Sequence, residues 1–365
     1  MNNTAPPAMP AHHGPPPGAA LAHHLRDRLF WYALAAMGGG WLLGILGAGQ
    51  AKAWAPALSW VMNIVVFLMI FPMMIGLNFA LLPKVFKQPR PLLLSLFYNF
   101  VLTPVIAWFL VQGMAGSPEL ALGFYLVMLI PGSSMAIAYT GMAGGSLELA
   151  TVAQAAGFLV APLVLPVFMY QVGQSYAIEV PLGMLVTSIV TVLILPMAAG
   201  ALTRRWMVGH YGPKTVERAK PMLGLITLLT MLLLIALIFF AKGELLAHNW
   251  RSLLPLVAAT IAFMAIILGL MTWLNRRLGL SYAEHMAVAF VSSGKNNATA
   301  IAIAVSVTAF SPLVAVPAAT LPLFQVVFLI GYLRLADWLR RYFDETKVGA
   351  DGTARQCHVN PQKGD

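Results

Sequence analysis

The chain has 365 residues, of which 59% are hydrophobic and only 9% are Asp, Glu, Lys or Arg. Soluble domains carry about 25% charged residues, so this composition excludes an ordinary soluble protein and is typical of an all-α polytopic membrane protein. The formal net charge of +10 comes from basic segments between apolar runs, and we expect no nucleic-acid partner. The one cysteine, Cys357, lies in a polar tail, which excludes a disulfide framework and a clustered thiol metal site. We expect no metal and no cofactor.

The two ends of the chain, residues 1–28 and 344–365, are polar, and we expect both to be disordered cytoplasmic tails. The N-terminal stretch is rich in Pro, Ala and His and has no basic region followed directly by an apolar core. It therefore does not resemble a cleaved signal peptide. Metal binding by its histidines is an alternative that this flexible composition disfavours: His12, His13, His23 and His24.

Apolar windows of about 20 residues recur along the chain and predict ten transmembrane helices. We expect residues 29–172 to form a first five-helix unit and residues 181–336 a second. The windows are Leu29–Ala48, Pro56–Leu81, Pro91–Met114, Leu120–Ala143, Leu149–Val172, Pro181–Thr203, Pro221–Ala241, Leu253–Leu274, Met286–Phe310 and Pro312–Ala336.

The basic residues predict the orientation of these spans, because cytoplasmic loops carry an excess of Lys and Arg. One set of loops carries most of them, with the longest basic loop at Arg204–Lys220, whereas the opposite set carries only Lys52, Lys242 and Arg251. We therefore expect both termini to be cytoplasmic in an integral protein of the cell (inner) membrane. Five spans with a cytoplasmic start end outside, so a second five-span unit would have the inverted orientation.

Two spans are interrupted at matched positions. The fourth span contains Pro131-Gly132 followed by two serines, and the ninth contains SSGKNN, residues 292–297. Paired interruptions in corresponding spans indicate the binding site of a transporter. A single Pro-Gly would more often be a simple kink, and it is the pairing that favours a site. The predicted helix breaks are Pro131, Gly132 and Gly294.

Lys295 is the strongest single signal, because a lysine at a helix centre costs about 2.5–3.5 kcal/mol on the insertion scale. No Asp or Glu lies mid-span, so this cation has no evident carboxylate partner. Three explanations are open for this lysine: an anionic ligand matches its charge, it loses its proton, or it holds half-helix carbonyls together as a structural lysine. The substrate- and ion-binding residues that the sequence predicts are Ser133, Ser134, Ser292, Ser293, Lys295, Asn296, Asn297, Asn99 and Gln154.

Three stretches resemble the bile acid:sodium symporter superfamily: LIPGSSMAIAYTGMAGG with the following span, SSGKNNATAIAIA, and FYNFVLTPVIAWFL. The resemblance covers Leu29 to Ala336. It implies two inverted five-helix repeats, a core domain with crossing helices four and nine, and a panel domain that rocks against it. It also implies a secondary transporter working by alternating access.

The departures from that family concern the sodium sites. Sodium-coupled members carry a carboxylate in the ninth span, where this chain has Ser292. They carry small polar groups or hydroxyls where it has Ala136, Ile137, Ala150 and Gln154. The resemblance therefore implies that the Lys295 ammonium replaces the cation. Transport of a small organic anion without Na⁺ is the expected function, with protons as an alternative coupling ion.

Other functions remain as alternatives. The superfamily includes arsenite-efflux permeases, which carry a cysteine in the fourth span. This chain has no cysteine inside its apolar spans, so arsenical efflux (arsenic resistance) would proceed by hydrogen bonding without a thiolate. A channel is a further alternative, and a transport rate that saturates with substrate concentration would exclude it. An enzyme is not expected, because acidic clusters and catalytic spacings are missing from the spans. We expect a monomer or homodimer in the lipid bilayer.

Overall fold

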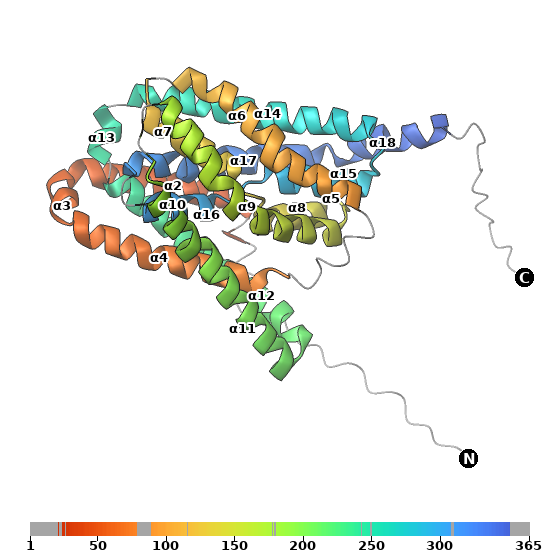
Figure 1. The fold of residues 1–365 in the computed structure, drawn as a ribbon, viewed down its shortest axis with the longest axis horizontal. Helices are drawn as coiled ribbons and strands as arrows, with labels where there is room; N and C mark the ends of the chain where they lie inside the picture. Colours follow the sequence, from red (N-terminus) through yellow and green to blue (C-terminus); the bar gives the residue numbers. More distant parts are fainter. Residues whose placement is uncertain are drawn as a thin grey trace, which may run out of the picture.

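The computed structural model describes residues 21, 24–25, 27–78, 89–114, 116–176, 178, 180–241, 243–248, 250–307 and 310–350. In these segments the regular elements are helices (Figure 1), and the only β-type pairing is an isolated antiparallel bridge between Gly132 and Lys295. Among the described residues, eight helical segments are long and apolar enough to cross a membrane. The protein is therefore a polytopic membrane protein built of helices.

The eight membrane-crossing segments agree with eight of the ten predicted windows. Spans three, six and ten each combine several elements: α5 (Pro89–Phe97), η2 (Tyr98–Leu102), α6 (Thr103–Val111) and η3 (Gln112–Met114); α10 (Leu182–Ile189), η4 (Val190–Ile194) and α11 (Leu195–Tyr211); and η6 (Pro312–Ala315) with α17 (Val316–Arg334). The single helices are α2 (Leu29–Leu46), α4 (Ala55–Gly76), α9 (Leu147–Ser175), α12 (Pro213–Ala241) and α14 (Leu253–Arg277).

The remaining two windows are the interrupted spans, and each folds as two short helices. Span four is α7 (Pro118–Leu129) and α8 (Ser134–Met142), and span nine is α15 (Tyr282–Ser293) and α16 (Asn297–Ser306). Short connecting helices α3 (Ala48–Ala53), α13 (Gly243–His248) and η5 (Trp250–Ser252) lie between longer ones. The predicted end of span two, residues 79–81, and the basic residues Lys84 and Lys87 lie outside the described residues.

Two π-helical turns interrupt the third and sixth spans, and each lies just before a proline. The turn Tyr98–Leu102 precedes Pro104, and the turn Val190–Ile194 precedes Pro196. A proline ring clashes with the carbonyl four residues earlier, and a widened turn relieves that clash. The first of these turns contains Asn99.

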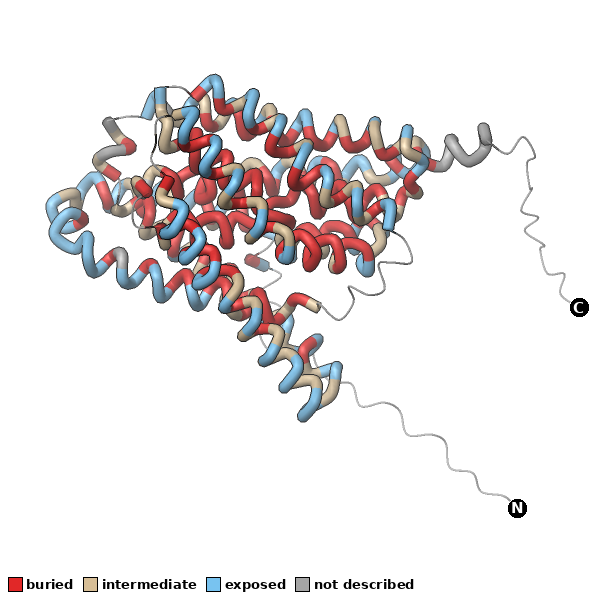
Figure 2. Tube along the Cα trace, viewed as in Figure 1, coloured by how far each residue is buried: buried red, intermediate tan, exposed pale blue. Residues whose placement is uncertain are grey.

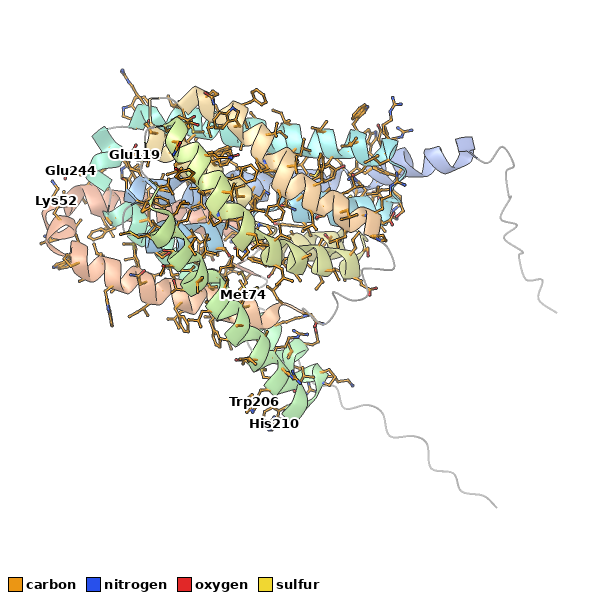
Figure 3. The ribbon with its side chains drawn as sticks, viewed as in Figure 1. Lys52, Met74, Glu119, Trp206, His210 and Glu244 are labelled. Atoms are coloured by element: carbon orange, nitrogen blue, oxygen red, sulfur yellow. The ribbon has the colours of Figure 1, made fainter. Side chains whose placement is uncertain are left out.

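The basic segment Arg204–Lys220 is not the loop that the sequence predicted. Helix α11 continues to Tyr211 and α12 begins at Pro213, so Gly212 alone turns the chain, with φ 81° and ψ 166°. That conformation is open to glycine only, and the following proline favours the start of a helix. The two helix ends project from the bundle, with Trp206 and His210 at the tip (Figure 3).

Helical structure extends into both of the predicted tails. Residues 24, 25 and 27 are helical, and Leu25 is buried. At the other end, α18 (Ala336–Ala350) runs beyond residue 344. Its apolar residues Leu339 and Phe343 are buried, and the Phe343 ring stacks on His285 at 4.3 Å, which anchors the helix. Residues 1–20 and 351–365 lie outside the described residues.

The helices form two groups by their contacts. In the first, α2, α4, α11 and α12 pack together; in the second, α7, α8, α9, α14, α15 and α17 pack together, and α16 and α17 contact both groups. The broken helices form the centre of the molecule: nearly every residue of α7, α15 and α16 is buried (Figure 2). The breaks therefore lie inside protein, where unwound backbone can be satisfied away from lipid.

Candidate functional site

The first break, residues 130–133, follows from its sequence. Pro131 has no N–H to continue the helical ladder, and the last turn of α7 closes with Ile130 N–H donating to Val127 O at 3.1 Å. Gly132 then permits a close approach between the two breaks, because a Cβ at this position would lie 2.3 Å from the backbone oxygen of Val291. Proline ends the helix and glycine makes room for its neighbour.

The second break, residues 294–296, is built differently. Helix α15 ends with Gly294 N–H donating to Phe290 O at 2.8 Å. Helix α16 begins with a side-chain cap, since Asn296 Oδ1 accepts a hydrogen bond from Thr299 N–H at 3.1 Å. An asparagine cap is a favoured start for a helix, which explains why an amide stands at this position of an apolar span.

The two breaks satisfy each other's backbone. Ser133 N–H donates to Gly294 O at 2.8 Å and Asn296 N–H donates to Pro131 O at 3.0 Å, around the bridge between Gly132 and Lys295. Unpaired backbone groups cost several kcal/mol in hydrocarbon, so neither break would be stable without the other. The pairing joins residues far apart in the sequence at a single point.

Two buried glutamines complete this crossing point. Gln154 Nε2 on α9 donates to Gly132 O at 2.9 Å, and Gln325 Nε2 on α17 donates to Lys295 O at 3.2 Å. Gln154 was expected among the site residues, whereas Gln325 was missed. The available signal was a lone amide in span ten, the counterpart of Gln154 in span five.

The Lys295 ammonium donates to Asn99 Oδ1 at 2.9 Å, and the lysine is fully buried. The amide of Asn99 in turn donates to Ser95 O at 2.9 Å and to Ser292 Oγ at 3.2 Å. Ser95 Oγ lies 3.3 Å from Ser292 Oγ, and Ser95 is a second residue that the sequence did not reveal. The π turn that contains Asn99 thus supplies the acceptor for the cation.

No carboxylate accompanies this cation among the described residues. Two ion pairs of the described residues, Lys52 with Glu244 and Lys220 with Glu217, lie at partly exposed positions. The pair of Lys52 and Glu244 marks one end of the bundle (Figure 3). Nor do three or more His, Cys, Asp or Glu side chains of the described segments form a metal site. The site around Lys295 is therefore electropositive if the amine is protonated.

A cavity of about 590 Å³ lies between the two helix groups, beside the breaks. Its walls on one side are Leu29, Pro72, Met73, Pro221 and Thr227 of α2, α4 and α12. Its other side comes from α8, α9, α16 and α17 and includes Ser133, Ser134, Gln154, Lys295, Asn296, Asn297 and Gln325. The cavity reaches Lys220 at the beginning of span seven.

Most of the predicted site residues reach this cavity, and three do not. Asn99 and Ser292 lie behind Lys295 and are not part of the cavity wall, and Ser293 Oγ donates to Ala289 O of its own helix at 2.6 Å. Asn296 contacts the first helix group, since its Nδ2 donates to Met73 Sδ at 3.0 Å. Asn99 thus binds the ammonium on the side away from the cavity.

Four residues of the cavity wall carry a buried oxygen without a hydrogen bond in the described structure. They are Ser133 (Oγ), Gln154 (Oε1), Asn297 (Oδ1) and Gln325 (Oε1). A buried polar atom left unpaired costs about 1–3 kcal/mol. Because these oxygens have almost no accessible surface, they lie within the wall and are not open to the cavity.

A separate polar network lies at the start of α15 and was not predicted. Tyr98 OH donates to Asn275 Oδ1 at 2.6 Å, and Asn275 Nδ2 lies 3.0 Å from His285 Nδ1. His285 Nε2 lies 2.7 Å from Tyr332 OH. Because Asn275 presents its N–H₂ group, His285 Nδ1 accepts and its Nε2–H donates to the tyrosine. This network joins η2, α14, α15 and α17.

Comparison with known proteins identifies relatives. The profile of the Sodium Bile acid symporter family matches residues 63–249, about half of the chain. PA2026 of Pseudomonas aeruginosa, whose name assigns no function, is 28% identical over 82% of this chain and 91% of its own. The protein slr0944 of Synechocystis, named an uncharacterized transporter, is 28% identical over 66% of this chain and 69% of its own. YocS of Bacillus subtilis, named an uncharacterized sodium-dependent transporter, is 24% identical over 72% and 79%.

Proposed function

The chain belongs to the Sodium Bile acid symporter family and is a secondary transporter, and from that premise we propose that it moves a small organic anion without Na⁺. The cavity beside the paired breaks is the binding site. The observation that carries the proposal is the sign of the charges there: two helix N-termini and a buried lysine, with no carboxylate in the described surroundings.

The helix N-termini supply the hydrogen-bond donors. Helices α8 and α16 begin at Ser134 and Asn297, and the first residues of both helices line the cavity: Ser134, Met135, Asn297 and Ala298. The first N–H groups of a helix have no intrahelical acceptor, and the helix dipole favours negative charge at this end. Buried Asn297 and half-buried Ser133, each with an unpaired oxygen among the described residues, add side chains that can turn to meet a ligand.

Lys295 is a tethered cation in this proposal. Its ammonium donates to Asn99, and the amide nitrogen of Asn99 in turn donates to Ser292 Oγ. The family resemblance places a carboxylate at Ser292 in sodium-coupled members, and this chain has none there. A fixed positive charge would repel Na⁺ and attract an anion in a region of low dielectric. The name of YocS includes sodium dependence, so the two proteins would differ in their coupling ion.

We also propose that the chain consists of two inverted five-helix repeats. The two broken spans are alike, since α7 and α15 each have 12 residues and α8 and α16 have 9 and 10. They begin at opposite ends of the bundle, α7 at the end of Lys52 and Glu244 and α15 at the other (Figures 1 and 3). Gln154 and Gln325 occupy the fifth span of each half. Residues 29–172 and 181–336 are then inverted repeats.

The first helix group, α2, α4, α11 and α12, would be the panel domain, and the second group with α16 the core domain. The basic residues favour cytoplasmic termini in the inner membrane. The cavity wall includes Leu29, Gly141, Leu147 and Lys220, at span ends expected on the cytoplasmic side. The structure would then be the inward-open state of an alternating-access cycle. Lys295 could exchange its proton during this cycle, which makes protons the candidate coupling ion.

A binding screen tests the proposal. Purified protein is heated with a panel of carboxylates, sulfonates and arsenite, with NaCl or KCl, and the shift in melting temperature is measured. We expect stabilisation by at least one organic anion, unchanged by Na⁺ and lost in Lys295→Met. The matched control is Lys52→Met, at an exposed lysine of the opposite end. Stabilisation by neutral arsenite alone would favour arsenical efflux, and a strict Na⁺ requirement would contradict the proposal.

A further inference from the structure

A second cavity lies on the outer face of the bundle, between α14, α17 and α18. It is a groove of about 660 Å³ and shares no lining residue with the cavity beside the breaks. The end of α14 lies near α18, which follows α17 in the chain (Figure 1). Three of its apolar residues, Trp273, Val327 and Trp338, are about half exposed. In a protein that spans a membrane, such a groove faces lipid.

Two glycines leave the space in this groove. Gly269 of α14 and Gly331 of α17 are exposed, and a Cβ at either position would meet no atom within 4 Å. Along α14 the groove runs from Ala265 to Trp273, which is about 12 Å at 1.5 Å per residue. This length lies within one leaflet, which is half of a hydrocarbon core about 30 Å thick. The groove therefore has the depth that part of an acyl chain requires.

The groove has an apolar lining. Its described lining residues include no Asp, Glu, Lys, Arg or His. Two of its hydroxyls already have partners in the protein: Thr272 Oγ1 donates to Leu268 O at 2.7 Å, and Tyr332 OH is bonded to Thr272 Oγ1 and to His285 Nε2. A hydrocarbon chain can fill this space without leaving those groups unpaired.

Arginines stack on the aromatic rings at the end of the groove where α14 ends. The guanidinium carbon of Arg276 lies 3.6 Å from the centre of the Tyr342 ring, and that of Arg277 lies 5.7 Å from the centre of the Trp273 ring. Tyr342 also stacks on Trp338 at 5.1 Å. Trp and Tyr are enriched at the membrane–water interface, and the planar donors of arginine match the geometry of a phosphate.

The charge around this end of the groove is positive. Among the described side chains of α14, α17 and α18, Asp337 is the only acid, whereas the arginines are Arg276, Arg277, Arg334, Arg340 and Arg341. Neither Arg276 nor Arg277 has a carboxylate partner among the described side chains. The basic ends of the spans are expected on the cytoplasmic side, where basic pockets between spans bind anionic lipid headgroups.

We propose that this groove is a binding site for an anionic phospholipid. One acyl chain lies along Gly269 and Gly331, and the phosphate binds Arg276 and Arg277. A zwitterionic lipid has the same chains, but its own ammonium offsets the charge of its phosphate, so the arginines favour the anionic lipid. The bound lipid contacts α14, α17 and α18 together and stabilises their packing. This site is independent of the transported substrate.

The test measures lipid affinity on the delipidated full chain by native mass spectrometry. The probes are dioleoyl phosphatidylglycerol, dioleoyl phosphatidylcholine, and glycerol 3-phosphate as a headgroup without chains. We expect phosphatidylglycerol to bind at least about tenfold more tightly than phosphatidylcholine, because each basic residue near a lipid phosphate contributes about fivefold. In the double variant Arg276→Gln with Arg277→Gln, this preference should fall below about threefold.

The matched control for charge is Arg205→Gln with Arg218→Gln. It removes the same charge at exposed positions of α11 and α12 and should keep the preference. Equal affinity for the two lipids in the wild type would overturn the proposal. A preference that persists in the Arg276 and Arg277 variant, or that falls equally in the control, would also overturn it. Full competition by glycerol 3-phosphate would show that the acyl chain contributes nothing, which contradicts the groove.

A second pair of variants tests the acyl-chain space. Gly331→Phe fills the groove, and we expect the affinity for both lipids to fall at least about tenfold, because each CH₂ group that loses its apolar contact weakens binding. Gly39→Phe on α2, also at an exposed glycine with no atom within 4 Å of the new Cβ, should leave both affinities unchanged.

Unchanged lipid affinity in Gly331→Phe would overturn the assignment of the chain to this groove. If the purified chain is a dimer that Gly331→Phe separates while lipid affinity stays the same, the groove is a contact between two copies and the lipid proposal fails. The arginine variant changes side chains at the rim of the groove and leaves its packed lining intact. Its result therefore decides the proposal even if Gly331→Phe does not fold.

Discussion

Gly132 and Lys295 pair their backbones at the point where both of their helices are broken. Gly132 has no side chain, which allows the close approach, and Lys295 carries a buried cationic side chain. The contact explains why the two interruptions occur together, since each supplies the hydrogen bonds that the other break leaves open. It also locates the cavity, which lies beside this pair.

The close approach at Gly132 predicts a large effect for Gly132→Ala. The new Cβ would lie 2.3 Å from Val291 O, which is backbone and cannot turn away. We expect the variant to lose binding of any anion that stabilises the wild type, and to lose about 2 kcal/mol or more of stability because core overpacking costs about 1–3 kcal/mol. Thermal unfolding in detergent measures both. The matched control is Gly269→Ala on α14, where no atom lies within 4 Å of the new Cβ; equal effects of the two changes would contradict the crossing geometry.

The pairing of Lys295 with Asn99 predicts unequal single and double substitutions. Asn99→Leu removes the acceptor of a buried cation, and we expect a loss of about 3–5 kcal/mol, as when one partner of a buried pair is removed. Lys295→Met alone leaves Asn99 with its other two partners and should cost less. The double variant should recover part of the Asn99→Leu loss, measured as the melting temperature. Additive losses would show that the two residues do not interact.

Sodium independence gives a prediction that requires no known substrate. The melting temperature of the purified protein should be the same in NaCl, KCl and choline chloride at matched ionic strength. A bound ion stabilises a protein in proportion to the logarithm of its concentration, by about 2.7 kcal/mol at 100 times its dissociation constant. A rise in melting temperature specific to Na⁺ would indicate a sodium site and contradict the role proposed for Lys295.

The buried network around His285 predicts a stability effect away from the cavity. Asn275→Leu leaves Tyr98 OH and His285 Nδ1 without the partner that each has now. We expect a loss of about 2–4 kcal/mol, because each unpaired buried group costs about 1–3 kcal/mol. Thr260→Val, on the same helix, removes a hydroxyl that bonds only its own helix at Leu256 O and should cost less. Anion selectivity should be unchanged in both variants.

The turn at Gly212 predicts opposite signs for two nearby substitutions. Gly212→Ala places a side chain at φ 81° and ψ 166°, and we expect a loss of about 1–3 kcal/mol. Gly209→Ala lies within α11, where no atom lies within 4 Å of the new Cβ, and should gain about 0.5–1 kcal/mol from helix propensity. Melting temperatures measure both. A loss at Gly209 would mean that the end of α11 is not helical.

The sequence predicted the membrane class, the positions of the spans and the two breaks. Long apolar runs report helices directly, because hydrocarbon admits few other structures. Pro131-Gly132 and Gly294 carry their own local reasons for ending a helix. The basic segment Arg204–Lys220 was misassigned as a loop because polarity shows where a span leaves the membrane and not where its helix ends. Gly212 alone marked the turn.

The sequence indicated a candidate site at the two breaks and did not indicate its contacts. Lys295 and the residues around it were identifiable because charge and amides are costly in a bilayer. The partner of the lysine was not, since Asn99 reaches it through a π turn in another span. The sequence did not predict Ser95 and Gln325, because a serine or a lone amide in a span more often makes a helix–helix contact.

What the sequence determined by itself is therefore local: which residues form helices, where two of them stop, and that a cation lies between. The tertiary structure decided what those features meet. It placed Gly132 against Lys295, turned the ammonium toward Asn99, and left the side-chain oxygens of two glutamines buried without a hydrogen bond among the described residues. The physical reason is that helix formation depends on neighbours along the chain, whereas the satisfaction of a buried polar group depends on whatever another segment brings beside it.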